Sequence, residues 1–180
     1  MTRADEQFVI STERLILRPP VLADFDEITP VYGDAGVVRY LGGRPFTREE
    51  SWARLMRHVG HWQLFGFGFW VIRDRQSGRY VGDAGLAYFR RQIEPAYEDA
   101  PEAGWVLAPL EQRQGFATEA VRAAHDWLDE RFKPRRTVCI IEPENAGSIR
   151  VAEKCGYKEF ARSNYKNSPI ALFERRLNDR

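Results

Sequence analysis

The sequence predicts one α/β (α+β) domain whose central sheet contains both antiparallel and parallel strands. Three observations carry this prediction. The chain has 180 residues, 43% of them hydrophobic and 29% charged, which suits one globular domain with a packed core. Two strand-like runs surround a polar turn within residues 67–89, which indicates an antiparallel hairpin. A strand, a helix and another strand follow one another within residues 102–141, which indicates a βαβ unit with a parallel pair.

The first half of the chain predicts a strand and two helices before the hairpin. Alternating polarity that ends at two prolines predicts the strand at 12–18. An acidic cap before an amphipathic segment predicts a short helix at 24–32, and a capping box formed by Thr47 and Glu50 predicts a longer helix at 47–62. The expected apolar face of the longer helix carries Trp52, Leu55, Val59 and Trp62. This favours a core role over an aromatic cage for both tryptophans.

The second half predicts three strands and two helices. The expected strands are 102–107, 137–141 and 170–177, and the expected helices are 117–132 and 148–154. Gly156 follows the last helix as its C′ residue. No repeat or linker divides the sequence, so we expect residues 1–180 to form a single domain.

Composition excludes several classes of protein. With 27 Lys and Arg against 26 Asp and Glu, the net charge of +1 gives no broad attraction to nucleic acid. No stretch reaches the roughly 20 apolar residues of a membrane helix, and the first residues lack the apolar region of a secretory signal, so we expect a cytoplasmic protein with no membrane partner. In that compartment Cys139 and Cys155 are expected to be reduced and to fill the core. His58 and His61 lie one helical turn apart, but no third ligand is nearby, so no metal site is expected.

The strongest functional signal is the loop Gln112-Arg113-Gln114-Gly115-Phe116-Ala117 between a strand and a helix. The first N–H groups of a helix have no intrahelical partner and favour anions. Gly115 lets the backbone approach a ligand, Ala117 leaves the first turn uncrowded, and Arg113 adds a charge. The loop therefore predicts a phosphate cradle, although a glycine at a helix start also suits an ordinary turn. The spacings of nucleoside-triphosphate and dinucleotide loops are absent.

The pattern Gln112-x-x-Gly115-x-Ala117 before an alanine-rich helix resembles the acyl-CoA pyrophosphate loop of the GNAT superfamily of N-acetyltransferases. Residues 12–18, 102–107, 142–148 and 154–157 resemble other blocks of the branch that contains the ribosomal-protein N-terminal (alanine) acetyltransferases, in the same order. The resemblance implies a single-domain acetyltransferase fold: a mixed, mostly antiparallel sheet flanked by helices. In that fold the parallel strands 102–107 and 137–142 splay apart to form the acyl-CoA cleft.

The resemblance also implies how acetyl-CoA would bind. Its pantetheine arm would pair with the backbone near Val106 and Leu107, and its pyrophosphate would take N–H groups from Arg113 to Thr118. Asn145 would hydrogen-bond the pantetheine, or else act only as a loop or helix-start residue. The expected cofactor-binding residues are Val106, Leu107, Gln112, Arg113, Gln114, Gly115, Phe116, Ala117, Thr118, Asn145 and Ser148.

The implied reaction is direct attack of an amine on the thioester through a tetrahedral intermediate. Glu102 would be the base, directly or through water, and the alternative is an exposed acidic residue at a strand edge. The family's usual tyrosine position is Ala152 here. Ser148 is therefore the candidate for contact with the CoA sulfur, while it also suits a helix N-cap. Tyr157 and Tyr165 are weaker candidates for an acid.

The acceptor stays open at this point. Acceptor pockets in the family are built from early helices and loops, here 47–62 and 92–101. Glu94, Glu98 and Asp99 would attract a cationic amine or are merely solvated. The expected function is acetyl transfer from acetyl-CoA to a primary amine on a protein N-terminus or a small molecule, by a monomer or homodimer. The alternatives are a non-catalytic acyl-CoA-binding module, suggested by the missing tyrosine, and a binding domain that takes no CoA.

Overall fold

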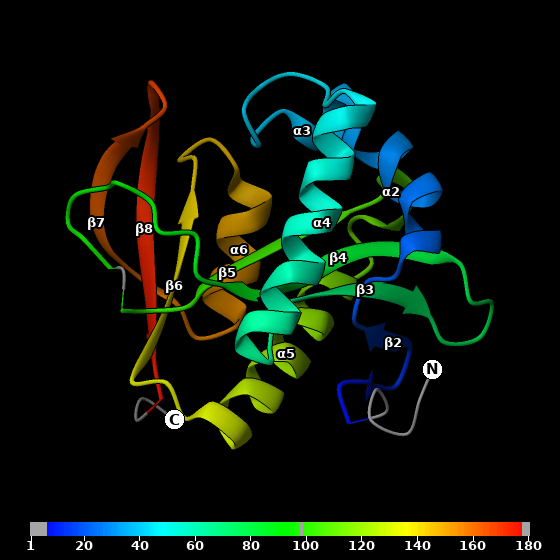
Figure 1. Cartoon of the computed structure of the whole chain (residues 1–180). Helices are drawn as coiled ribbons and strands as arrows, with labels where there is room; N and C mark the ends of the chain where they lie inside the picture. The colour runs from blue at the N-terminus through cyan, green and yellow to red at the C-terminus, as the bar shows by residue number, and fades with distance from the viewer. Residues whose placement is uncertain (1–6, 98, 178–180) are drawn as a thin grey trace.

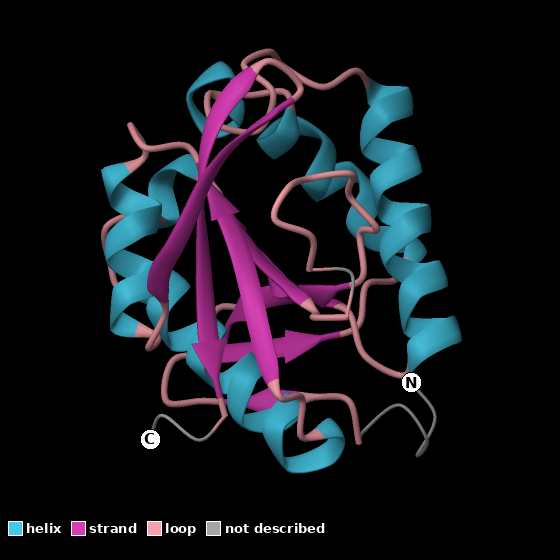
Figure 2. Cartoon of the chain, turned by 90° about the vertical axis from the view of Figure 1, so that its left-hand side faces the viewer, coloured by secondary structure: helices cyan, strands magenta, loops and turns pink. Residues whose placement is uncertain are grey.

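The computed structural model describes residues 7–97 and 99–177, which form one eight-stranded sheet with helices on both sides (Figures 1 and 2). The strands are β1 (Ile10–Ser11), β2 (Leu15–Arg18), β3 (Phe69–Asp74), β4 (Tyr80–Ala87), β5 (Glu102–Leu107), β6 (Arg136–Ile141), β7 (Lys158–Tyr165) and β8 (Ser168–Arg176). The helices are η1 (Leu22–Asp24), α2 (Phe25–Tyr32), α3 (Ala35–Val38), α4 (Arg48–Phe65), η2 (Pro109–Glu111), α5 (Phe116–Phe132) and α6 (Ala146–Lys154).

The sheet is mixed and mostly antiparallel, as predicted. Its strand order is β1-β2-β3-β4-β5-β6-β8-β7, and β5 and β6 are its parallel pair. The register of that pair joins only Glu102 and Val138. Beyond this point the two strands separate toward their carboxyl ends, so the predicted splay is confirmed. We call the region between residues 103–107 of β5 and 139–141 of β6 the splay.

The two faces of the sheet carry different cores. The α5 face holds Trp70, Ala103 and Leu107 against α5, whereas Val71 and Val106 face α2 and α4. Successive strand residues point to opposite faces. Glu102 and Gly104 therefore share the α4 face with Val106. On the same face, the segment before β5 packs Ile93 and Tyr97 against Val138 and Leu172 of β6 and β8.

The predicted apolar face of α4 is wrong in part. The capping box of Thr47 and Glu50 forms as expected, but the buried residues of the helix are Ser51, Leu55, His58 and His61. Trp52 is 41% exposed and packs edge-on against Phe25 of α2, and Val59 is also exposed. The large apolar residues misled the prediction because the face against the sheet is filled by smaller and polar side chains. Trp62 is half-buried against the core, as expected, and its indole N–H donates to Phe69 O.

Besides the two short 3-10 helices η1 and η2, three elements escape the sequence analysis: β1, α3 and β7. β1 and α3 are too short to show a period. β7 is an edge strand with many exposed residues, and its turn to β8 uses Lys166 and Asn167 in left-handed conformations (φ +50° and +66°) instead of glycine. Polar edges and glycine-free turns leave little signal in a sequence.

The structure also corrects the start of α6. This helix begins at Ala146 rather than Ser148, because the side-chain oxygen of Asn145 accepts the N–H of Ser148 at 3.1 Å. Asn145 is therefore the N-cap, and the N-cap role considered for Ser148 is wrong. Gly156 has φ +87° after the helix, as expected for a C′ residue.

His61, Cys139 and Cys155 are buried in the fold, where they pack or hydrogen-bond with neighbouring residues. His61 Nδ1 donates to Phe67 O (2.7 Å) and its Nε2 accepts the N–H of Tyr88 (3.0 Å), so backbone groups engage both nitrogens. Cys139 and Cys155 are buried and unpaired, as predicted. None of the helices in residues 7–97 and 99–177 has the length and apolarity needed to cross a bilayer.

Candidate active site

The loop before α5 presents a row of free backbone donors. Gly115 is the N-cap of α5 with φ +86°, and Arg113 also adopts a left-handed conformation (φ +64°). The first backbone bond of the helix joins Glu119 N–H to Gly115 O at 3.1 Å. Within the described part of the chain, the N–H groups from Arg113 to Thr118 find no acceptor. Such a helix start attracts anions through its free donors and its dipole.

Space is also available for a ligand at this loop. A Cβ built on Gly115 would meet only one atom within 4 Å, Nη2 of Arg14 at 3.4 Å. The loop is exposed from Gln112 to Gly115. An anion can therefore approach the backbone donors without a side chain in the way.

Arg14, which the sequence analysis did not single out, braces this loop from the start of β2. Its guanidinium donates to Gln114 O (3.0 Å) and to Glu119 Oε2 (2.8 Å), and it stacks over the Phe116 ring at 4.5 Å. Thr12 Oγ1 donates to the other oxygen of Glu119 at 2.6 Å. Burial alone would raise the pKa of Glu119, but these hydrogen bonds outweigh it and lower that pKa. Thr12 and Arg14, in the segment between β1 and β2, therefore hold the loop in place.

The splay supplies an open strand edge next to this loop. Past Glu102, the edge of β5 that faces β6 has no strand partner among the described residues, although the opposite edge pairs with β4 along its whole length. Val106 and Leu107 lie in this stretch, and the side chain of Gln112 donates to Leu107 O at 3.2 Å. An extended chain can pair with such an edge as an added strand.

Asn145 and Ser148 stand at the far side of the splay, after β6. The side-chain oxygen of Asn145 is used by its capping bond, while no acceptor for its amide nitrogen is found among the described residues. The Ser148 side chain is half-buried, and its hydroxyl likewise has no partner within that part of the chain. Both side chains thus keep a donor free at the start of α6.

Glu102 is held at the point where β5 and β6 part. Glu102 is only 4% exposed, so the alternative of an exposed acid at a strand edge is wrong. Arg91 donates to both oxygens, from Nε at 2.7 Å and from Nη2 at 2.8 Å, and the Tyr97 hydroxyl donates at 2.8 Å. Three donors therefore hold the carboxylate of Glu102 in one orientation.

Arginines and aromatic rings surround Glu102 on the α4 face. Arg57 and Arg91 lie over the ring of Phe89, at 5.6 and 4.7 Å from its centre, and Arg91 also lies over Tyr165 at 4.9 Å. Phe69 packs against Phe89 at 5.9 Å. The set joins α4, the segment after β4 and the end of β7. The sequence analysis predicted none of these contacts, because they join residues far apart in the chain.

A buried carboxylate lies further along the same face. Asp83 is 2% exposed and accepts the Tyr32 hydroxyl at 2.8 Å. Burial raises the pKa of Asp83 to about 6, against the lowering effect of Arg54. This side chain was not among the predicted site residues.

Known proteins resemble this chain along most of its length. Residues 14–158 match the family model described as an acetyltransferase (GNAT) domain. The chain belongs to the GNAT acetyltransferase family. A solved structure from Bordetella pertussis that is described as GNAT-family is 31% identical, covers 93% of this chain and 98% of its own, and has a TM-score of 0.81. The uncharacterized protein YkkB of Bacillus subtilis is 29% identical over 92% of this chain and 94% of its own. YnaD of the same organism, an uncharacterized N-acetyltransferase, is 27% identical over 83% of this chain and 82% of its own.

The tyrosine candidates of this acetyltransferase fall in different places. Tyr157 is 2% exposed within the core of the α5 face, and its hydroxyl contacts His125 Nε2 (2.8 Å) and Thr137 Oγ1 (2.9 Å). Burial raises the pKa of Tyr157 well above its ordinary value. Tyr165 lies on the α4 face beside Arg91. Ala152, where the resemblance implied a tyrosine position, is fully buried.

Of the acids in the segment before β5, the described ones, Glu94 and Asp99, take no part in the hydrogen bonds around Glu102. Asp99 accepts a hydrogen bond from Arg136 at 3.0 Å, and Glu94 is exposed. Glu98 lies outside the described residues. Among the described residues, the charged side chain that hydrogen-bonds Glu102 is that of Arg91. The neighbour of Glu102 is therefore a positive charge, and not the negative charge that was expected to attract a cationic amine.

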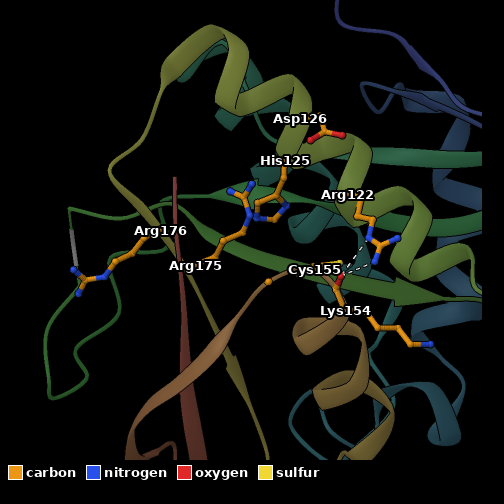
Figure 3. Close-up of a pocket in the computed structure, with 8 residues that line it drawn as sticks. Arg122, His125, Asp126, Lys154, Cys155, Arg175 and Arg176 are labelled. Carbon is orange, nitrogen blue, oxygen red and sulfur yellow. Dashed lines mark hydrogen bonds between the residues drawn. The ribbon is translucent and has the colours of Figure 1, made fainter. Parts of the chain in front are cut away.

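A separate cavity of about 220 Å³ lies between α5, the end of α6 and β8 (Figure 3). Arg122 reaches from α5 to the carbonyl oxygen of Lys154 at 2.7 Å, and Arg175 pairs with Asp129 at 2.6 Å. No residue predicted for the acetyltransferase site lines this cavity. Arg122 and Arg175 thus use their guanidinium groups in contacts within the fold.

Proposed function

We propose that residues 1–180 act as one N-acetyltransferase domain that moves the acetyl group of acetyl-CoA to a primary amine. One observation carries the proposal: the row of free N–H groups from Arg113 to Thr118 adjoins the unpaired edge of β5. A pyrophosphate suits the first feature and an extended pantetheine suits the second. Acetyl-CoA contains both groups in that order.

The binding roles follow from these contacts. The backbone of residues 113–118, with Gly115, Phe116 and Ala117 at the helix start, receives the pyrophosphate, and the Arg113 side chain adds a positive charge. Gln112 and Gln114 tie the loop to Leu107 and Leu110 through their side-chain amides (3.2 and 2.8 Å). Val106 and Leu107 offer their backbone to the pantetheine, and the free amide of Asn145 faces it from the other side of the splay.

The chemistry is acyl transfer without a covalent enzyme intermediate. The neutral amine attacks the thioester carbonyl, and the tetrahedral intermediate places negative charge on oxygen. Unpaired N–H groups of β5 are the candidate donors to that oxygen. Collapse breaks the C–S bond, the amine proton leaves through Glu102 or a water held by it, and CoA departs as a thiolate that Ser148 contacts before protonation. The products are the amide and CoA.

Glu102 suits the base role by its position, at the closed end of the splay. Tyr97 is the weaker of its partners, since Arg91 holds the carboxylate with two charge-assisted bonds. A water that takes the place of the Tyr97 bond would carry the proton from the amine to the carboxylate.

The alternative is a module that binds acyl-CoA without turnover. Ala152 at the usual tyrosine position favours it, because that site lacks a side chain able to protonate a thiolate. Both possibilities predict acetyl-CoA binding, so only turnover separates them.

The deciding experiment supplies acetyl-CoA and a panel of primary amines and follows the release of CoA thiol. Mass spectrometry then tests whether the amine has gained an acetyl group. Acetylated product supports the transferase, and acetyl-CoA binding with no product from any amine supports the non-catalytic module. Ser148→Ala tests the thiolate contact: unchanged turnover together with unchanged CoA affinity would remove Ser148 from the site.

A further inference from the structure

Three arginines gather on the face of the sheet that carries Glu102. Arg54 lies over the rings of Tyr32 (4.5 Å) and Phe69 (5.9 Å). Arg57 and Arg91 share the ring of Phe89, which itself packs on Phe69. Burial lowers the pKa of Arg57, and the charges of Arg54 and Arg91 lower it further. Like charges brought this close favour the binding of an anion between them.

Buried polar atoms without partners lie beside these arginines. His58 is 5% exposed, stacks on Phe69 at 4.5 Å, and its Nε2 has no hydrogen-bond partner in the part of the chain that the structure describes. The Nε of Arg54 is likewise buried without a hydrogen-bond partner among the described residues. Burial lowers the pKa of His58 well below its ordinary value, so this ring is neutral. Unpartnered buried polar atoms are rare in folded proteins, and a bound ligand is one way to satisfy them.

The local carboxylates do not balance the arginines. Glu102 accepts hydrogen bonds from Arg91 and Tyr97, and Asp83 accepts from Tyr32 and lies near Arg54. Arg57 has no carboxylate partner within residues 7–97 and 99–177. Among the described residues, the guanidinium of Arg57 is therefore left without a carboxylate partner, one aromatic ring away from Arg91.

We propose that the amine acceptor carries a carboxylate or phosphate group, which binds Arg57 together with Arg54 and Arg91. The inference rests on the proposed acetyl transfer and names the class of its acceptor. Guanidinium groups bind both kinds of anion through paired N–H donors. Arg91 contacts both the Phe89 ring and Glu102, so an anion on this ring is separated from the base by one side chain. A short acceptor can then hold its anion at Arg57 while its amine reaches the splay.

The same arrangement selects against polycationic acceptors. A second positive charge on the acceptor would lie against three guanidinium groups, and repulsion between desolvated like charges is costly. Acceptor charge therefore distinguishes this proposal from acetyl transfer in general.

The first test compares amines that differ mainly in the anion. Glycylglycine is paired with glycylglycine amide, and O-phosphoethanolamine with ethanolamine, while spermidine represents the cations. Rates are compared as kcat/KM per deprotonated amine, so that differences in amine pKa do not enter. We expect the anionic member of at least one pair to be preferred about tenfold or more, and which pair responds separates carboxylate from phosphate. A preference for spermidine or for the uncharged members would overturn the proposal.

The second test reverses the charge of Arg57, which is an exposed residue of α4 and not part of the core. Arg57→Glu should lower kcat/KM for the anionic probe roughly 10- to 100-fold, as expected for the loss of a charged hydrogen bond, and leave the uncharged probe nearly unchanged. Arg48→Glu is the matched control, because Arg48 lies on the same helix and also stacks on a ring, that of Phe25 at 4.3 Å. Equal effects of the two variants, or no effect of Arg57→Glu on the anionic probe, would contradict the proposal.

A measurement without turnover covers the case in which no probe is acetylated. Calorimetric titration of O-phosphoethanolamine and of glycylglycine into the CoA-saturated protein should show binding that Arg57→Glu weakens and Arg48→Glu does not. Absence of binding at millimolar concentration overturns the inference. Failure of acetyl-CoA itself to bind would instead contradict the proposed function, so the two failures are distinguishable.

Discussion

The Arg91 guanidinium holds both oxygens of the Glu102 carboxylate, at 2.7 and 2.8 Å, where the parallel strands β5 and β6 part. The pair links two tasks that acetyl transfer requires. Glu102 is the candidate base, and Arg91 belongs to the group of arginines that would bind an anionic acceptor. An acceptor anion that accepts hydrogen bonds from Arg91 would weaken the bonds between Arg91 and Glu102. Acceptor binding would then make the Glu102 carboxylate more available to accept a proton.

The first prediction concerns Glu102. Glu102→Gln should lower kcat/KM for an amine about 10²- to 10⁴-fold, the usual contribution of general base catalysis, without changing the dissociation constant of acetyl-CoA. Asp129→Asn is the control, because it weakens another buried pair, Asp129 with Arg175, away from the splay. Steady-state kinetics and calorimetry measure the two quantities. Full activity of Glu102→Gln across the pH range would remove Glu102 from the mechanism.

The second prediction separates two roles of Asn145. Asn145→Asp keeps the side-chain oxygen that caps α6 but removes the amide donor. We expect its melting temperature to stay near that of the wild type and its affinity for acetyl-CoA to fall. Asn145→Ala should lose both, with about 1 kcal/mol of stability lost with the cap. Unchanged acetyl-CoA affinity in Asn145→Asp would leave Asn145 with the capping role alone.

The third prediction concerns the brace under the anion loop. Arg14→Ala removes the bonds to Gln114 and Glu119, so the loop should become less ordered and the dissociation constant of acetyl-CoA should rise several-fold to about tenfold. Arg75→Ala provides the comparison, because Arg75 bonds the Thr12 carbonyl of the same segment but does not contact the loop. If both variants bind acetyl-CoA as the wild type does, Arg14 is only a surface residue.

The fourth prediction concerns the pH dependence of stability. Burial lowers the pKa of His125 to about 4, from an unfolded value near 6.5. Because His125 is neutral in the folded state, its full contribution to the free energy of unfolding is present above pH 6.5. This contribution is lost as the pH falls toward 4, and the loss amounts to about 3 kcal/mol. Urea unfolding of wild type and His125→Gln should therefore show a stability difference that narrows between pH 6.5 and 4.

This comparison also removes the effect of Asp83, which has the opposite sign. The raised pKa of Asp83, about 6, contributes stability that is lost as the pH rises from about 3.8 through 6, in both proteins alike. A difference between wild type and His125→Gln that stays constant from pH 7.5 to 4 would contradict the assignment of His125 as a neutral core residue.

Much of the fold follows from local pattern. The segment 102–107 coincides with β5, the helix after Gly115 ends at Phe132 before Pro134, and the parallel pair has the predicted partners. These elements have strong periods and clear boundary residues, which is the information that a sequence carries locally. The anion loop was predictable for the same reason, since a glycine and a helix start are adjacent in the chain.

The features that sequence reasoning missed depend on distant partners. Arg14 reaches the loop across the sheet, and Trp52 is exposed because α2 offers it an edge contact instead of a core. The arginine group around Phe89 forms only when α4 lies beside the segment after β4. Arg54 and Arg57 lie three positions apart on α4, as on a solvated helix face, and Arg91 lies far from them in the chain, so only the fold shows that the three meet.

Thermal unfolding with and without acetyl-CoA tests the central claim most directly, namely that the α5 loop and the splay bind this ligand. At about 100 times its dissociation constant the ligand should add roughly 2.7 kcal/mol, which predicts a midpoint rise of about 5–10 °C. Gly115→Trp should abolish the rise by filling the cradle, whereas Gly78→Trp should keep it, because Gly78 (φ +74°) has the same backbone strain and open space in the turn between β3 and β4, outside the loop. A wild-type midpoint that does not move at millimolar acetyl-CoA would contradict the claim.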